Sequence, residues 1–290
     1  EKRAYENYPS FNVKKAYVEA ALDIGFNVFS LANNHTNDQG KDGILQTHEY
    51  FTELSERGIA WAGIKKEKSD DYTYSVIEKN GFKILFFAYT ELLNQSAHKE
   101  LIDYIPPNKK EREVFIEFAK KIKKEIEPDF CIVSVHCADP EYVIAVSKER
   151  KAFYKELSDK IANIVWGNHP HLVQEWEWIG NKETGTIEKA IFYACGNTIS
   201  GQRLSLNYES PSAYREYTGD GIIFSFDLKK DENGKCFIEN NTEQLITTII
   251  DSEKNSLVKL FNFDFINLQN EKDKAYFTKR LELMKKIKGN

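Results

Sequence analysis

The sequence lacks any run of apolar residues long enough to cross a membrane, because such a helix needs roughly 20 of them in a row. Its first residues, Glu1 to Glu6, also lack the charged, apolar and small-residue regions of a signal peptide. Within the residues given, we therefore expect neither a membrane helix nor a secretion signal.

Cysteine is scarce, and Cys131, Cys137, Cys195 and Cys236 lack the close paired spacing of a zinc ribbon or a redox motif. Three of them lie in apolar segments or just beyond one, so we expect small buried thiols. A role for Cys137 as a soft metal ligand is the weaker alternative, because no second thiol is suitably spaced.

The sequence also lacks a large excess of charge of either sign. Its formal net charge is −5, which gives no indication of a nucleic-acid partner. The basic clusters at residues 109–112 and 120–124 alternate with glutamates in helical patterns. Such patterns are typical of a solvated helix face.

Helix and strand patterns alternate along most of the chain. Helices are predicted at residues 12–23, with Asn12 as the cap, and at 44–56, 111–125, 148–160 and 270–286. Strands are predicted at residues 26–31, 72–78, 82–89, 130–135, 161–166, 172–179, 187–195, 221–228 and 236–250. Asn80-Gly81 predicts a type I′ hairpin turn. This order predicts an α/β sandwich, with mixed sheets flanked by helices.

A chain of 290 residues is long enough for one main domain with appended elements. We expect residues 1–250 to form this domain and residues 251–290 to form a C-terminal helical extension packed on it. The polar segment 201–219 is the candidate for a long functional loop.

Histidines follow three of the predicted strands. Strand 26–31 leads into Asn34-His35, strand 130–135 leads into His136, and the strand at 161–166 leads into His169-Pro170-His171. Ligands of open α/β sheets bind beyond the carboxyl ends of strands. Four of the six histidines lie at such ends, so the sequence predicts that they share a site.

His169 and His171 form the sharpest local feature. Pro170 favours an extended conformation at His169, and side chains at i and i+2 of an extended segment point to the same side. Neutral imidazole is the commonest metal ligand in proteins. Each histidine motif alone has a structural alternative, namely an incidental His-Pro-His, a local turn at Asn34-His35 or a core histidine at His136. Together they predict a metal site.

Four segments resemble the capsule-synthesis CapA (poly-γ-glutamate synthesis) family of calcineurin-like metallophosphoesterases, over roughly residues 8 to 228. They are Ser30-Leu31-Ala32-Asn33-Asn34-His35-Thr36-Asn37-Asp38-Gln39-Gly40, Val133-Ser134-Val135-His136 with Glu141-Tyr142, Gly167-Asn168-His169-Pro170-His171-Leu172-Val173-Gln174, and Tyr193-Ala194-Cys195-Gly196-Asn197.

The resemblance implies a site with two divalent metal ions, such as Mn, Fe or Zn. Asn34, His136 and His169 would ligate one ion, and His171 would help to ligate the other. His35 would act as the general acid. The supporting residues are weaker matches: Asp38 to orient the His35 loop, Glu141 to line the cleft, Asn168 as an oxyanion donor or a turn residue, and Asn197 to bind substrate.

Two departures from the family stand out. Its phosphoesterases begin with a strand that ends in an Asp-containing motif, and nothing before Tyr5 supplies that strand. We therefore expect a metallophosphoesterase-like α/β sandwich without its N-terminal strand. Cys137-Ala138-Asp139 also replaces a Gly-containing turn.

The resemblance implies a metal-dependent phosphoesterase-like protein of capsule or poly-γ-glutamate synthesis. It would act at the extracytoplasmic face of the cell membrane, through an N-terminal anchor outside this chain. Its partners would be an anionic polymer or a phosphorylated small molecule, and other capsule-synthesis membrane proteins. Two alternatives remain: a non-catalytic binding module of the capsule machinery with a partial metal site, and a nucleotide or sugar phosphatase.

Overall fold

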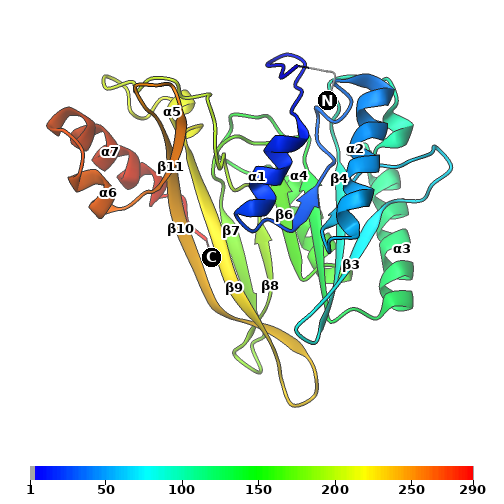
Figure 1. Cartoon of the computed structure of the whole chain (residues 1–290). Coiled ribbons are helices and arrows are strands. Elements are labelled where there is room, and N and C mark those ends of the chain that lie inside the picture. The colour runs from blue at the N-terminus through cyan, green and yellow to red at the C-terminus, as the bar shows by residue number, and fades with distance from the viewer. Residues whose placement is uncertain (1–3, 290) are drawn as a thin grey trace. The chain divides into compact units, whose positions relative to one another are not determined.

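The structure is a computed structural model, and it describes residues 4–289 (Figure 1). These residues form two compact units. The first unit runs to Ala138 and includes Lys160–Ala162. The second contains Asp139–Asp159 and the described residues from Asn163 onward. Both units combine helices with strands, so the chain has the mixed α/β fold that the sequence predicts.

In the first unit, strand β4 is flanked by two partners of opposite direction. It runs antiparallel to β3 and parallel to β5, which makes this a mixed sheet. A separate parallel pair joins β1 to β2. The elements of the unit are α1 (Lys15–Asp23), β1 (Val28–Ser30), α2 (Gly40–Ser55), β2 (Ala60–Ala62), β3 (Tyr74–Lys79), β4 (Phe82–Thr90), the 3-10 helix η1 (Lys99–Leu101), α3 (Lys109–Ile126) and β5 (Phe130–His136).

The hairpin between β3 and β4 confirms the predicted turn. Asn80 and Gly81 both have positive φ, at 52° and 79°, as a type I′ turn requires. The apolar run of β4 is buried from Leu85 onward, as expected for a strand covered on both faces. The Phe87 and Phe115 rings, 5.8 Å apart, pack α3 against β4.

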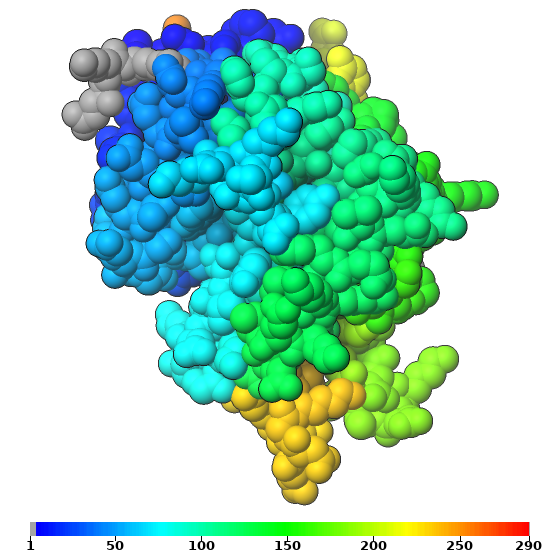
Figure 2. Space-filling model, turned by 90° about the vertical axis from the view of Figure 1, so that its right-hand side faces the viewer, coloured from blue at the N-terminus to red at the C-terminus, as the bar shows by residue number. Residues whose placement is uncertain are grey.

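Helix α3 follows directly from its sequence. The Asn108 side chain caps it by accepting from the Glu111 backbone N–H, and Glu127 ends it in the left-handed conformation. On its outer side, Lys109 and Glu113 form one of several exposed ion pairs. Most of the basic residues of this helix are solvated, as predicted, but Arg112 is not, because its side chain is 11 % exposed and pairs with buried Glu91 at 2.7 Å. Figure 2 shows this face of the first unit, with α3 beside α2 and the loop that follows β2.

In the second unit, strand β8 takes the central place. It runs parallel to β6 and antiparallel to β7 and β10, and β10 also pairs antiparallel with β9 and β11. The elements of the unit are α4 (Lys148–Lys160), β6 (Ile164–Asn168), β7 (Trp176–Gly180), β8 (Ile187–Phe192), α5 (Tyr214–Tyr217), β9 (Asp220–Lys230), β10 (Cys236–Ile250), β11 (Ser256–Leu260), α6 (Phe263–Asn267) and α7 (Glu271–Met284).

The C-terminal helices belong to the core of the second unit. Phe265 of α6 and Phe277 and Leu281 of α7 are buried in one cluster with Leu172 and Ile222. Residues 251–290 also contribute strand β11, so the segment is more than helical. The expected domain boundary at residue 250 stays a prediction.

Several local predictions need correction. Asn12 does not cap α1, which begins at Lys15 after Lys14; instead, Asn12 donates its side-chain amide to the Ala4 carbonyl. Strands β2 and β11 and helices α5 and α6 had no predicted counterpart. All four span only three to five residues, too few to show a period.

The cysteines are small buried thiols, as expected. Cys131, Cys137 and Cys236 are buried, Cys195 is partly so, and all four are free. Burial raises the pKa of both Cys131 and Cys195 to about 12, which keeps these thiols protonated near neutral pH. Across residues 4–289, no helix is both long and apolar enough to span a bilayer.

Candidate functional site

The first group of candidate residues lies in a tight loop that follows β1. The Asn33 side chain accepts from the His35 backbone N–H at 2.8 Å, and the Thr36 hydroxyl donates to the Leu31 carbonyl at 2.9 Å. Short polar side chains thus replace the hydrogen bonds that the strand loses at its end. The loop holds Asn34 and His35 at the carboxyl end of β1, as predicted.

His35 and Asp38 form a hydrogen-bonded pair within this loop. His35 Nδ1 lies 2.7 Å from Asp38 Oδ2, and the same oxygen accepts from the Phe11 backbone N–H at 2.9 Å. The Asp38 side chain is 1 % exposed and the His35 side chain 25 % exposed. Because Asp38 accepts the hydrogen bond from Nδ1, Nε2 is the His35 atom available to a ligand. The pairing agrees with the role predicted for Asp38.

Asn34 meets His136 in the same unit. The Oδ1 atom of Asn34, which is buried, lies 3.0 Å from Nε2 of His136 at the end of β5. Two ligand atoms that each lie about 2.1 Å from one ion, at right angles, are about 3.0 Å apart. The two atoms form a hydrogen bond, in which Nε2 donates to Oδ1. The same separation fits two ligands of one divalent metal once Nε2 has lost its proton.

Asn94 is a residue that the sequence analysis missed. Its Oδ1 accepts from Asn34 Nδ2 at 3.2 Å, so the amide oxygen of Asn34 is turned toward His136. Its Nδ2 also lies 3.3 Å from each ring nitrogen of His35, Nδ1 and Nε2. Asn94 lies four residues beyond the end of β4, so the strand-end rule used for the histidines could have found it.

A cavity of about 420 Å³ opens beside His35. Its lining is largely apolar, from Phe11, Val18, Phe29 and Phe51. The ring of Phe11 contacts the His35 imidazole edge-on, with centroids 4.6 Å apart. His35 is therefore one of the polar groups, with Asn33 and Thr36 of the same loop, that border this apolar space.

The second unit contains the remaining candidates, and here one prediction was wrong. His169 follows β6 and is buried, but its φ is 100°, so it is not extended as Pro170 was expected to make it. The chain bends at this point. A non-glycine residue in this region is strained, and such strain persists only where the surrounding structure imposes it.

His171 is held from three directions within the second unit. Its backbone N–H donates to the Glu141 carbonyl at 2.9 Å, and its Nδ1 lies 2.9 Å from Asn197 Oδ1. The ring stacks on Tyr142, with centroids 5.8 Å apart and planes 25° apart. These contacts leave Nε2 as the atom suited to ligate a metal.

The other predicted residues of this unit have distinct positions. Asn168 is the last residue of β6, and Asn197 lies against His171. Glu141 hydrogen-bonds the Tyr142 hydroxyl; burial first, and then this carboxylate, raises the pKa of Tyr142. The first unit thus gathers Asn34, His35, Asp38 and His136, and the second gathers Glu141, His171 and Asn197.

Within the described residues, no three or more His, Cys, Asp and Glu side chains form a group that could hold a metal. The Asn34–His136 pair brings an amide oxygen and an imidazole nitrogen together, and the predicted four-ligand set stays a prediction.

Two solved structures are similar to this chain. A hypothetical protein from Thermus thermophilus is 15 % identical with a TM-score of 0.43, over 80 % of this chain and 81 % of that one. The calcineurin-like phosphoesterase YfkN from Bacillus subtilis is 14 % identical with a TM-score of 0.35, over 76 % of this chain and 60 % of that one.

Two curated relatives are similar in sequence. The capsule biosynthesis protein CapA of Bacillus anthracis is 28 % identical over 66 % of this chain and 44 % of its own length. The PGA biosynthesis protein CapA of Bacillus subtilis (strain 168) is 26 % identical over 76 % of this chain and 52 % of its own length. The chain thus spans about half the length of these relatives.

The family described as "Bacterial capsule synthesis protein PGA_cap" matches residues 1–202, which include every candidate residue of both units. This match covers more than two thirds of the 290 residues. The chain belongs to the bacterial capsule synthesis protein PGA_cap family.

Proposed function

We propose that this chain provides a metal-dependent phosphoesterase site to a protein of bacterial capsule synthesis. The observation that carries the proposal is the 3.0 Å separation of Asn34 Oδ1 and His136 Nε2, in the same unit as the His35–Asp38 pair. The first pair fits a divalent metal, and the second fits proton transfer. Metal-assisted phosphoester hydrolysis makes use of both functions.

In the first unit, Asn34 and His136 would ligate a divalent ion, and in the second unit His169 and His171 would serve as metal ligands. When bound, such ions lower the pKa of a coordinated water and offset the charge of phosphoryl oxygens. His35 would donate the Nε2 proton to the departing oxygen, because Asp38 holds the proton on Nδ1. Asp38 would keep the ring in this orientation.

The names of the two Bacillus relatives support the biological setting. They are described as proteins of capsule biosynthesis and of PGA biosynthesis. We therefore propose an anionic polymer or a phosphorylated small molecule as substrate, with other capsule-synthesis membrane proteins as partners. The site of action would be the extracytoplasmic face of the cell membrane.

The test is metal content by elemental analysis, with phosphodiesterase and phosphomonoesterase assays under added Mn²⁺. Variants His136→Ala and His169→Ala/His171→Ala carry changes in one unit each. His48→Gln, on α2, is the control, because its ring packs on Trp61 outside both groups. We expect bound metal and activity in the wild type and in His48→Gln, and the loss of both in the other two variants.

Because each variant changes one unit, the assays show whether phosphoesterase activity depends on residues of the first unit, of the second unit or of both. Loss of activity from either unit's variant supports the proposal. A folded wild-type chain that binds no Mn²⁺ and cleaves neither class of ester would overturn it, and a non-catalytic binding role would then be the better account.

A further inference from the structure

The amide of Asn197 is fully engaged by other protein groups. Its Oδ1 lies 2.9 Å from His171 Nδ1, and its Nδ2 donates to the Thr218 carbonyl at 2.8 Å and to Gln202 Oε1 at 3.0 Å. A rotation of the amide by 180° would place Oδ1 against the Thr218 carbonyl, where two acceptors would meet. The orientation of Asn197 is therefore fixed by a backbone group.

This orientation decides the tautomer of His171. Because Asn197 presents an oxygen, the facing Nδ1 of His171 must carry the proton. The lone pair of the neutral ring is then on Nε2. Free histidine favours the opposite tautomer, with the proton on Nε2, so Asn197 prepares the ring for metal binding at Nε2.

The Thr218 carbonyl belongs to the peptide that joins Thr218 to Gly219. The Arg203 guanidinium lies close to Gly219, where an added Cβ would come within 2.0 Å of Arg203 Cζ. Arg203 also donates to the carbonyls of Gly219, at 3.2 Å, and Thr248, at 2.8 Å. A residue larger than glycine would displace Arg203 and, with it, the peptide that Asn197 binds.

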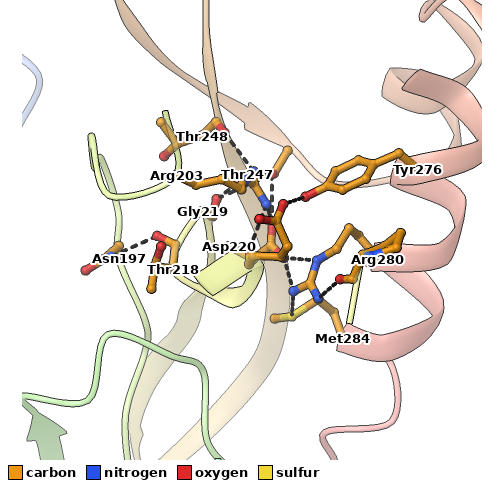
Figure 3. Close-up of polar contacts among 12 residues, drawn as sticks. Asn197, Arg203, Thr218, Gly219, Asp220, Thr247, Thr248, Tyr276, Arg280 and Met284 are labelled. Atoms are coloured by element: carbon orange, nitrogen blue, oxygen red, sulfur yellow. Dashed lines mark hydrogen bonds and ion pairs between the residues drawn. The ribbon is translucent and has the colours of Figure 1, made fainter. Parts of the chain in front are cut away.

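A buried ion cluster completes this arrangement (Figure 3). Asp220 accepts from Arg203 at 2.9 Å through Oδ1 and from Arg280 at 3.0 and 2.5 Å through Oδ2. Burial lowers the pKa of Arg203, but Asp220, Tyr276 and Glu216 together outweigh it, and the net pKa is raised. Arg280, on α7, also donates to the Pro211 carbonyl at 2.8 Å.

We propose that Asn197 and the cluster of Arg203, Asp220 and Arg280 are positioning residues that hold His171 as its Nδ1–H tautomer. The proposal rests on the proposed function, in which His171 ligates a metal. The cluster lies after residue 202, beyond the segment that matches the family. In this way the C-terminal part of the chain determines the tautomer of His171: Asp220 positions the Thr218 peptide, and Thr218 orients Asn197.

The direct test reads the tautomer in the metal-free protein. Long-range ¹H–¹⁵N correlation spectra of ¹⁵N-histidine protein, at a pH where the ring is neutral, distinguish Nδ1–H from Nε2–H. The His171→Gln spectrum identifies the signals. We expect Nδ1–H in the wild type and a shift toward Nε2–H in Asn197→Ala and in Arg280→Lys, which keeps the charge but loses the paired contact.

Lys279→Ala is the matched control, because Lys279 precedes Arg280 on α7 but is exposed and pairs with Glu282. It should leave the tautomer unchanged. Mn²⁺ affinity, measured by calorimetry, should fall about 10- to 100-fold in Asn197→Ala, the usual effect of losing such a partner. Thermal unfolding confirms that each variant is folded.

Two results would overturn the proposal: an Nε2–H signal for His171 in the wild type, or a folded Asn197→Ala protein with an unchanged tautomer. Failure of the proposed function looks different. Suppose that the tautomer depends on Asn197 but that His171→Gln binds Mn²⁺ as the wild type does. The result would support the positioning of His171 by Asn197 and would contradict the role of His171 as a metal ligand.

Discussion

His35 Nδ1 lies 2.7 Å from Asp38 Oδ2, three residues further along the same loop. The carboxylate is nearly inaccessible, whereas a quarter of the imidazole side chain is exposed. Asp38 is also tied to the Phe11 backbone at 2.9 Å, so it does not turn away from the ring. The pair therefore presents Nε2 in a fixed direction, as a group that transfers protons must.

Asp38→Asn is expected to reduce phosphoesterase turnover. The amide no longer offsets the charge of a protonated His35, so the proton donor is lost. We expect kcat to fall by about 10²- to 10⁴-fold for alkyl esters, the range of general acid catalysis. The loss should be much smaller for 4-nitrophenyl esters, because that leaving group departs without a proton. Steady-state kinetics on both ester classes measures the difference.

Asp23→Asn is the control for charge, since Asp23 is exposed at the end of α1 in the same unit. It should leave kcat unchanged for both esters. Equal losses for the two ester classes in Asp38→Asn would contradict proton donation by His35 and would indicate a structural role for the pair.

Sequence predicts the parts of this fold whose signal is local. The Asn80-Gly81 turn and the apolar runs of β4 and β5 specify their own conformations, and the structure confirms all three. Strand β2 is three residues long and β11 is largely exposed, so neither carries a period or an apolar run. They form because a neighbouring strand supplies the hydrogen bonds.

The same distinction applies to the candidate residues. Histidines after strands were found because position and residue type coincide. Asn94 was missed because the strand-end rule was applied to histidines alone, and its contact with Asn34, 60 positions away, leaves no local pattern of its own. The extended conformation predicted for His169 was wrong, since Pro170 supplies a local preference that the surrounding structure overrides at φ 100°.

Asn94→Ala is expected to weaken metal binding without removing a ligand. Without the Asn94 oxygen, the Asn34 amide loses the acceptor that turns its own oxygen toward His136. We expect Mn²⁺ affinity to fall about 10-fold, as for other residues that orient ligands. Calorimetric titration of the metal-free protein measures this change.

Gln95→Ala provides the matched control, because Gln95 is the next residue and its side chain is exposed. Its backbone carbonyl, which accepts from Asn37 Nδ2 at 2.8 Å, is retained. Identical Mn²⁺ affinities for the Asn94 and Gln95 variants would refute the orienting role of Asn94.

Asp103 should make stability depend on pH. Burial raises its pKa from 3.8 to about 6, against the opposing effects of Thr73 and Lys65. Between about pH 4 and 6 the folded chain thus binds more protons than the unfolded chain, so the free energy of unfolding falls as pH rises. The total change is about 3 kcal/mol, at about 1.4 kcal/mol per pKa unit.

Asp103→Asn should abolish this pH dependence. The difference in free energy of unfolding between the variant and the wild type should therefore change from pH 4 to 6 and be constant above about pH 7. Urea unfolding at each pH gives the free energies. Asp71→Asn is the control, since Asp71 is exposed. A constant difference between Asp103→Asn and the wild type from pH 4 to 7 would show that the Asp103 pKa is not raised.

Asp220→Asn is expected to destabilise the second unit strongly. Asp220, Arg203 and Arg280 are at most 3 % exposed, so the substitution leaves two buried guanidinium groups without their shared carboxylate. Loss of one member of a buried ion pair costs about 3–5 kcal/mol. Urea unfolding measures the loss, and Asp227→Asn, at an exposed position of the same strand, should change stability by less than about 0.5 kcal/mol.

The double variant Asp220→Asn/Arg280→Met tests the cause of that loss. Methionine retains much of the buried volume but removes one of the two uncompensated charges, so the double variant should be more stable than Asp220→Asn alone. A further loss on adding Arg280→Met would mean that the packing of the Arg280 side chain against Tyr217, 3.9 Å from the ring centroid, stabilises this region more than the charge pairing does.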